Sequence, residues 1–300
     1  MEIINDIEYT GELEPTTIAL GTFDGVHVAH QAVISTAVDS EFAPAVFTFN
    51  RIPAGVITGG NIGEISTISI KQQLIENMGV KYYISPDFLS VKDMSPRDFV
   101  LMLKEKFNAH RIVCGYDFRF GKDAAGAPIH LKQLCREFKM KFSVVTPRIL
   151  EDFTPISSTL IRHLIAQGEI VKARELLGHD FSYDFVVEQG NHIGTELSTP
   201  TINQIFPINF VKPRFGVYAS KTEIDGKVYK SVTNVGIKPT VGENEPMSET
   251  HIFDYSGDLY QKKVKVSLYF FIREERKFEN LDELSLAIQN DVKYVKDMIY

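Results

Sequence analysis

The stretch Gly21-Thr22-Phe23-Asp24-Gly25-Val26-His27-Val28-Ala29-His30-Gln31 decides the fold of the first half of the chain. It follows an apolar run, Thr17-Ile18-Ala19-Leu20, which is typical of a buried strand, and residues 32–38 continue with helical spacing. The stretch therefore predicts a turn from a strand into a helix. In an open α/β sheet, ligands bind outside the carboxyl ends of the strands, and helix N-termini there present N–H groups to anions.

The glycines and histidines of this stretch indicate a phosphate site. Gly21 and Gly25 allow the backbone to turn sharply and to approach a ligand closely. His27 and His30 are three residues apart, so they share one face of the first helical turn and can both donate to phosphate oxygens. The stretch lacks the Gly-Lys-Ser/Thr ending of a Walker loop. A histidine that only caps or packs is the alternative, but the combination favours a nucleotide site.

Composition limits the class of protein. The 300 residues, 44% of them hydrophobic, can form one large or two ordinary domains. The net charge of −7 gives no reason to expect a nucleic acid partner. Cys114 and Cys135 make no disulfide framework, which fits a reducing cytosol. No apolar run approaches membrane-spanning length, and the acidic N-terminus lacks the features of a signal peptide. We expect a cytoplasmic protein without a membrane partner; the oligomeric state stays open.

Strand-like and helix-like segments alternate up to about residue 180, which is typical of a doubly wound parallel sheet. Ser95 and Pro96 mark the start of one helix, and Gly168 and Gly178 mark the ends of two others. The expected strands are 43–49, 82–85, 111–114 and 142–146, and the other expected helices are 70–78 and 129–140.

The pattern then changes to strands separated by turns. The expected strands are 183–188, 216–224, 227–235, 249–255 and 263–273, with turn signals such as Asp225-Gly226 between them. This predicts a small antiparallel β-barrel. A C-terminal helix begins after Asn280, with an apolar face formed by Leu281, Leu284, Ile288, Val292 and Val295. We therefore predict an α/β fold in two domains, residues 1–181 and 182–300.

Two further segments of the first domain carry candidate site residues. In Gly115-Tyr116-Asp117-Phe118-Arg119-Phe120-Gly121-Lys122, the two phenylalanines can hold a flat ring between them, although core packing is the commoner role for such residues. In Ile156-Ser157-Ser158-Thr159-Leu160-Ile161-Arg162, hydroxyls at a helix start and an arginine one turn later suit a phosphate chain. A plain serine N-cap is the alternative, and the two roles can coexist.

These three segments, in this order, resemble the signatures G-x-F-D-G-x-H-x-G-H, G-x-D-F-x-F-G and I-S-S-T-x-I-R of the bacterial bifunctional riboflavin kinase/FAD synthetases. The resemblance implies a Rossmann-like nucleotidyltransferase domain that transfers AMP from ATP to FMN, with Mg²⁺, to give FAD and pyrophosphate. It assigns His27, His30, Ser158 and Arg162 to the triphosphate. The remaining binding residues that it implies are Gly21, Phe23, Asp24, Gly25, Asn50, Asp117, Phe118, Phe120, Ser157 and Thr159.

The chain departs from the family pattern at two places in this domain. Ala29 stands where the family has a glycine between the histidines. In Thr48-Phe49-Asn50-Arg51-Ile52-Pro53, Arg51 and Ile52 replace a proline and a histidine of the family's T-F-x-P-H-P, which puts some substrate contacts in doubt.

The second domain resembles a flavokinase. Residues 190–203 are similar to the loop G-x-x-x-G…L-G-x-P-T-A-N, which implies that Thr201 and Asn203 hold Mg²⁺ and the phosphates of ADP. Glu249 aligns with the family's general base for the ribityl hydroxyl of riboflavin. Family residues are replaced by Thr195, Ser198, Lys238 and Gln261. From these departures we predict that this domain phosphorylates riboflavin poorly or not at all.

Three alternatives stay open at this point. The first is a nucleotidyltransferase that acts on another phosphate, such as a pantetheine or nicotinate nucleotide, although such enzymes need no kinase-like tail. The second is a fully bifunctional enzyme with both steps intact. The third, from a different class, is a non-catalytic protein that senses flavins or nucleotides.

Overall fold

The computed structural model describes residues 1–189, 201–239, 244–276 and 279–298. The predictions that concern Thr195 and Ser198 therefore lie outside the described residues. By its internal packing the chain divides into two units. Unit 1 contains Met1–Ile62 and Lys71–Ser158, and unit 2 contains Gly63–Ile70 and Thr159–Tyr300.

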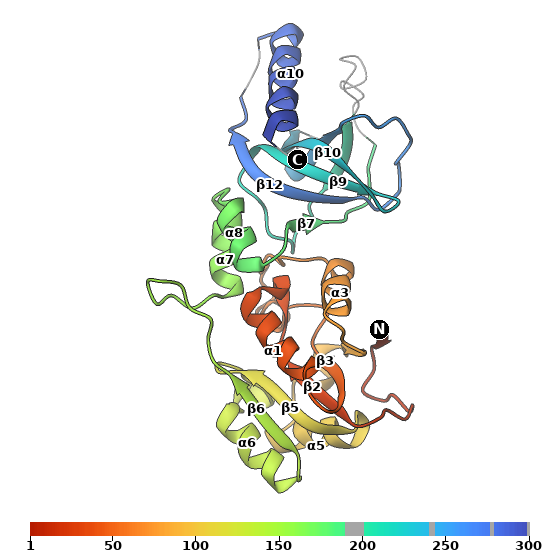
Figure 1. Ribbon diagram of the computed structural model, residues 1–300, viewed down its shortest axis with the longest axis vertical. Coiled ribbons are helices and arrows are strands. Elements are labelled where there is room, and N and C mark those ends of the chain that lie inside the picture. The colour runs from red at the N-terminus through yellow and green to blue at the C-terminus, as the bar shows by residue number, and fades with distance from the viewer. Residues whose placement is uncertain (190–200, 240–243, 277–278, 299–300) are drawn as a thin grey trace. The chain divides into compact units, whose positions relative to one another are not determined.

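Unit 1 is built on a six-stranded sheet with strand order β1-β4-β3-β2-β5-β6 (Figure 1). Every pairing in it is parallel, which confirms the predicted doubly wound sheet. The strands are β1 Glu2–Ile4, β2 Thr16–Leu20, β3 Ala43–Phe47, β4 Tyr82–Ile84, β5 Ala109–Gly115 and β6 Lys141–Val145. The helices are α1 Val28–Val38, α2 Pro53–Thr58, α3 Ile68–Asn77, α4 Phe88–Val91, α5 Pro96–Lys106 and α6 Pro128–Glu137.

The central strand β2 is buried on both faces, because its successive residues point to opposite sides of the sheet and helices cover each side. On β2, Ile18 packs with α5 and α6 residues such as Leu103 and Leu131. Its neighbour Ala19 packs with α1 and α3 residues such as Ile34 and Ile75. Continuous apolar strands of this kind are typical of parallel sheets covered by helices on each side.

The two cysteines lie in the first of these cores and form no disulfide. Cys114 and Cys135 are both free and buried. Burial raises the pKa of each thiol to about 12, so both stay protonated at neutral pH. They therefore behave as small apolar core residues.

Unit 2 contains a second six-stranded sheet, antiparallel throughout, with strand order β7-β12-β9-β10-β11-β8. The strands are β7 Phe181–Tyr183, β8 Thr201–Ile205, β9 Gly216–Ile224, β10 Lys227–Pro239, β11 Asn244–Ile252 and β12 Lys265–Arg273. Its helices include α8 Ile170–Leu177 and α10 Leu281–Met298, and α7 Ser158–Ala166 joins it from its second residue onward.

Residues 185–188 close this sheet into the predicted barrel. After β7, Val186 pairs with Lys263 beside β12, and Glu188 pairs with Asn203 on β8. The Glu188 N–H donates to the Asn203 carbonyl at 2.8 Å. This stretch therefore joins the two outer edges of the sheet, and it accounts for a predicted strand at 183–188 that is longer than the observed β7.

The interior of the barrel is unusually polar. Ser220 lies 2.8 Å from both Ser231 and Thr233, and Thr233 lies 2.9 Å from Thr250, measured between hydroxyl oxygens. All four residues are fully buried. Because each hydroxyl can donate one hydrogen bond and accept others, the network satisfies groups whose burial would otherwise be costly.

The packing division differs from the domain boundary predicted from the sequence. Packing separates the units before Thr159, whereas the predicted boundary between residues 181 and 182 lies after α8. The reason is that α8 packs with the barrel sheet: the Arg174 side chain pairs with Asp180 at 2.8 Å and lies over the ring of Tyr269. The division by packing is a different quantity from a domain boundary, and the boundary between residues 181 and 182 stays a prediction.

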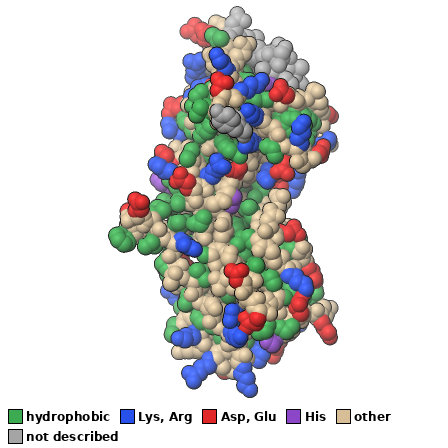
Figure 2. Space-filling view, viewed as in Figure 1, with side chains coloured by type: hydrophobic (Ala, Val, Ile, Leu, Met, Phe, Trp, Pro, Cys, Tyr) green, Lys and Arg blue, Asp and Glu red, His purple; other side chains and the backbone are tan. Residues whose placement is uncertain are grey.

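On the face shown in Figure 2, Lys and Arg side chains are mixed with Asp and Glu in each unit, without a dominant basic patch. Among the described residues, no helix is both long and apolar enough to span a membrane.

A first prediction concerns the start of α5. The Ser95 hydroxyl accepts from the Asp98 N–H at 3.1 Å and donates to the Asp98 carboxylate at 2.7 Å, as the predicted N-cap requires. Replacing Ser95 with Ala should cost about 1 kcal/mol of unfolding free energy. Chemical denaturation, followed by a signal that reports on unit 1 alone, measures this loss of unfolding free energy. Ser95→Thr is the matched control, because threonine keeps the capping hydroxyl. An unchanged midpoint in the alanine variant would contradict the assignment.

Candidate active sites

The loop between β2 and α1 has a strained backbone. Phe23 and Val26 adopt positive φ angles of 49° and 39°, and Gly25 adopts 76°. A left-handed conformation costs a residue with a side chain about 1–2 kcal/mol, and it is rarest for a β-branched residue such as Val26. Such strain persists only where the surroundings enforce it, and it is concentrated at functional sites.

His27 caps the helix that follows. Its Nδ1 accepts from the His30 N–H at 3.3 Å, and the two rings stack with centroids 3.6 Å apart. In that bond Nδ1 carries no proton, so the neutral ring carries its proton on Nε2. The edge of the Phe23 ring meets His30 at a centroid distance of 5.4 Å. The capping alternative is therefore realised for His27.

Hydroxyl groups from two other segments hold the loop in place. The Ser158 hydroxyl, at the start of α7, donates to the Asp24 carbonyl at 3.0 Å. The Thr48 hydroxyl, just after β3, donates to the Thr22 carbonyl at 2.8 Å. Within unit 1 the structure thus brings Ser158 together with the glycine–histidine loop and gives its hydroxyl an anchoring contact; its assignment to the triphosphate stays a prediction.

Phe118 and Phe120 do not hold a flat ring between them. Their rings are already parallel to each other, with centroids 5.9 Å apart, whereas two stacking contacts of about 3.5 Å each would need about 7 Å. Phe120 is buried and packs against Phe99 in the core, so the packing alternative is correct for it. Phe118 is half-buried and Asp117 is exposed. A flat ligand would have to lie on the other side of the Phe118 ring.

The remaining predicted residues of this half are less closely grouped. Asn50 is half-buried after β3, and its Oδ1 has no hydrogen-bond partner among the described residues. Thr159 and Arg162 belong to unit 2 by packing. Thr159 is exposed, and the Arg162 Nε donates to the Gly63 carbonyl at 2.7 Å. Their assignment to the nucleotide stays a prediction.

The sequence reasoning missed one buried cation in unit 1. Lys71 is only 6% exposed, and its ammonium donates to the Phe49 carbonyl at 2.7 Å, where β3 ends. A lysine is rarely buried without a specific partner. The sequence signal that could have revealed this burial is the position of the lysine, directly after Ile70 on the apolar side of the helix predicted at residues 70–78.

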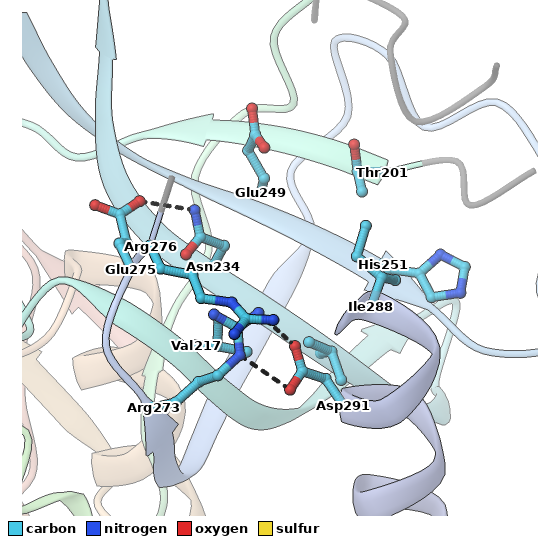
Figure 3. A pocket seen from close by; sticks show the side chains of 11 residues that line it. Thr201, Val217, Asn234, Glu249, His251, Arg273, Glu275, Arg276, Ile288 and Asp291 are labelled. Carbon is cyan, nitrogen blue, oxygen red and sulfur yellow. Dashed lines mark hydrogen bonds and ion pairs between the residues drawn. The ribbon is translucent and has the colours of Figure 1, made fainter. Parts of the chain in front are cut away.

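Unit 2 contains a cavity of about 160 Å³ between the barrel and α10 (Figure 3). Its lining residues come from β8 to β12, the segment after β12, and α10: Thr201, Val217, Val232, Asn234, Glu249, His251, Arg273, Glu275, Arg276, Ile288 and Asp291.

The register of β8 and β11 brings the predicted kinase residues together. Asn203 lies opposite Glu249, and Thr201 lies opposite His251. Thr201 and Glu249 line the cavity, whereas Asn203 is buried and its Oδ1 has no hydrogen-bond partner within the described part of the chain. An amide oxygen in need of a partner, beside a threonine hydroxyl, fits a hard cation such as Mg²⁺.

Residues 10–160 match the family model of FAD synthetase, and residues 177–299 match that of riboflavin kinase. A bifunctional riboflavin kinase/FMN adenylyltransferase of Bacillus subtilis (strain 168) is 32% identical over 291 residues, which span 93% of this chain and 91% of that protein. The chain belongs to the bifunctional riboflavin kinase/FMN adenylyltransferase family.

The Escherichia coli (strain K12) member of this bifunctional family is 29% identical over 291 residues, 93% of this chain and 91% of that protein. A crystal structure described as a macrolide-efflux protein from Streptococcus pneumoniae superposes with a TM-score of 0.86 at 27% identity, and the match covers 98% of both chains. The family resemblance predicted from the three motifs is confirmed, and the second domain is accounted for as a riboflavin kinase domain.

In the riboflavin kinase domain, four of the cavity residues that were not predicted as site residues pair with one another. The Asn234 amide donates to the Glu275 carboxylate at 3.0 Å. Arg273 forms two bonds to Asp291, from Nη2 at 2.7 Å and from Nε at 3.2 Å. The available signal was Asp291 itself, an acidic residue on the apolar face predicted for the C-terminal helix.

A second prediction separates the two roles of His27. Asparagine is a good N-cap but lacks the ring Nε2–H, whereas alanine provides neither. His27→Ala should therefore lower the unfolding free energy of unit 1 by about 1–2 kcal/mol, from the lost cap and the lost ring stacking. His27→Asn should lose less than half of that. Equal destabilisation by the two substitutions, measured by denaturant titration, would argue against a capping role.

Proposed function

We propose that unit 1 and the start of α7 transfer AMP from ATP to FMN. A phosphate oxygen of FMN attacks the α-phosphorus of ATP, the bond from that phosphorus to the bridging oxygen breaks, and pyrophosphate leaves. The products are FAD and pyrophosphate, and no protein nucleophile is needed. The observation that carries the proposal is the strained, buried loop that sets two stacked histidines at the N-terminus of α1.

The protein's contribution to this reaction is positioning and charge stabilisation. Negative charge grows on the pyrophosphate oxygens as they leave. The Nε2–H of His27 and the ring of His30 are donors suited to that charge, and the first N–H groups of α1 add to them. The Ser157 hydroxyl, just before α7, can extend the same donor set, whereas the Ser158 hydroxyl gives its single proton to the Asp24 carbonyl and holds the loop. A divalent cation such as Mg²⁺ would neutralise part of the triphosphate charge when bound.

The second proposed activity is phosphorylation of riboflavin in the cavity of unit 2. Glu249 is exposed at the cavity and can accept the proton of the ribityl 5′-hydroxyl as that oxygen attacks the γ-phosphorus of ATP. ADP leaves and FMN forms. Thr201 and the buried Asn203 oxygen support a Mg²⁺ and phosphate site next to this carboxylate. The small-molecule partners proposed for the chain are thus ATP, riboflavin and FMN.

A third prediction tests the adenylyl transfer. His30→Ala should reduce FMN-to-FAD turnover by about 100- to 1,000-fold, because one preorganised charge-stabilising donor is lost. Chromatography of flavins after incubation with FMN, ATP and Mg²⁺ gives the rate. Riboflavin phosphorylation by the same sample is the internal control and should not change. Unaltered FAD formation would remove His30 from the reaction.

A fourth prediction compares the two activities. The kinase domain carries Ser198 where the family loop has a glycine and Lys238 in place of an arginine. A side chain penalises positive φ, and lysine lacks the two-pronged contact of arginine. We therefore expect riboflavin phosphorylation to be slower than FMN adenylylation, and Ser198→Gly combined with Lys238→Arg to raise it.

One assay with riboflavin or FMN, ATP and Mg²⁺ checks this comparison. Equal rates would favour the fully bifunctional alternative over the prediction of a weak kinase. Flavin binding without either product would favour the alternative of a non-catalytic flavin- or nucleotide-sensing protein.

A further inference from the structure

Helix α10 forms one wall of the cavity in unit 2, and its attachment to the barrel has two parts of different character. Val295 is fully buried and joins Val217 and Val232 in an apolar cluster. Such contacts hold the helix on the barrel. Because they are non-directional, they only weakly restrict the sliding of α10 along its axis and its rotation about that axis. The second part is the ion pair between Arg273 on β12 and Asp291 on α10, drawn in Figure 3.

The geometry of this pair fixes both partners. Arg273 uses Nε and Nη2 on the two oxygens of Asp291, at 3.2 and 2.7 Å, and Nη1 donates to the Glu274 carbonyl at 3.2 Å. Two parallel bonds between a planar guanidinium and a carboxylate set direction as well as distance. Asp291 is only 7% exposed, so few of its contacts are with water. Because these groups satisfy each other, they are poorly available to a substrate.

The pair also determines where the cavity wall stands. Ile288 is three residues before Asp291, so both lie on one face of α10, and both line the cavity. The apolar residues that the barrel contributes to the lining are Val217 and Val232. A rotation of α10 by a fraction of a turn would move the Ile288 side chain away from these two valines. It would therefore change the width of the apolar part of the cavity.

We propose that the Arg273–Asp291 pair positions α10 so that Ile288 closes the apolar wall against the flat ring of a flavin substrate. The pair acts through the helix and does not touch the substrate. This inference rests on the proposed riboflavin kinase function of the cavity. It predicts that breaking the pair weakens flavin binding in unit 2 and leaves FMN adenylylation unchanged.

The test is amide hydrogen exchange on the full chain, titrated with riboflavin in the presence of ADP and Mg²⁺. In the wild-type protein, riboflavin should slow exchange in α10 and β10. In Asp291→Asn and in Arg273→Gln, α10 should exchange faster without ligand, and the riboflavin concentration for half-maximal protection should rise about tenfold, which corresponds to about 1.4 kcal/mol. The double variant should be no worse than either single variant, because both remove the same interaction.

Asp297→Asn is the matched control. It removes one negative charge, as Asp291→Asn does, at an exposed position of the same helix. The amide exchange of α10 and the riboflavin titration should therefore match those of the wild-type protein. Where turnover is measurable, the KM for riboflavin should rise in the pair variants while kcat changes little.

The outcomes are distinguishable. Absence of riboflavin protection in the wild-type protein would overturn the proposed flavin site and this inference with it. Protection in the wild type that persists unchanged in both pair variants, or additive losses in the double variant, would overturn the positioning role alone. Asp291→Asn could abolish protection from exchange throughout β9 and β10 because the barrel itself has loosened. In that case Arg273→Lys is the deciding variant, because lysine keeps the positive charge and removes only the second hydrogen bond to Asp291. An unchanged titration in that variant would overturn the proposal.

Discussion

The nucleotidyltransferase half depends on one enforced turn, the strained backbone at Phe23 and Val26 between β2 and α1. Two residues with side chains in the left-handed region cost about 1–2 kcal/mol each. Phe23 is only 1% exposed, and burial of its ring stabilises the fold by about 1.5–3 kcal/mol, which offsets this cost and holds the turn in place. The hydroxyls of Thr48 and Ser158 then bind the loop carbonyls. The two histidines therefore follow directly on a turn whose backbone is held by packing and by hydrogen bonds.

The kinase half depends on a different device, the register between neighbouring strands. Thr201, Asn203 and Glu249 meet because β8 pairs with β11, and β8 is itself fixed by the stretch at Glu188 that closes the barrel. The hydroxyl network inside the barrel adds to this precision. Side chains that must find specific hydroxyl partners tolerate a register slip poorly, since a shift of one residue would turn them to the outer face.

The parts of the structure that could be predicted from the sequence are those with a strong local signal. The β9–β10 hairpin follows from Asp225-Gly226, whose φ angles of 49° and 77° are those of the expected turn. The turn from a strand into a helix at residues 21–31 also had a local signal, the apolar run before it and the helical spacing after it. Strand β8 was missed because its sequence is short and mostly polar, and its pairing partners lie far along the chain. The stacking of Phe118 on Phe120 and the pairing of Arg273 with Asp291 depend on tertiary packing, which local periodicity does not contain.

Ala29 illustrates how a departure from a family pattern can be understood from the structure. It lies in the first turn of α1, two residues after the cap formed by His27, and its backbone is helical. At an ordinary helical position alanine is favoured over glycine by about 1 kcal/mol. The methyl group therefore stabilises the start of the helix at the point where the preceding turn is strained, and it offsets part of that strain. The same methyl group narrows the approach to the backbone between the two histidines. In this chain the start of α1 thus favours stability of the helix over an open approach to its backbone.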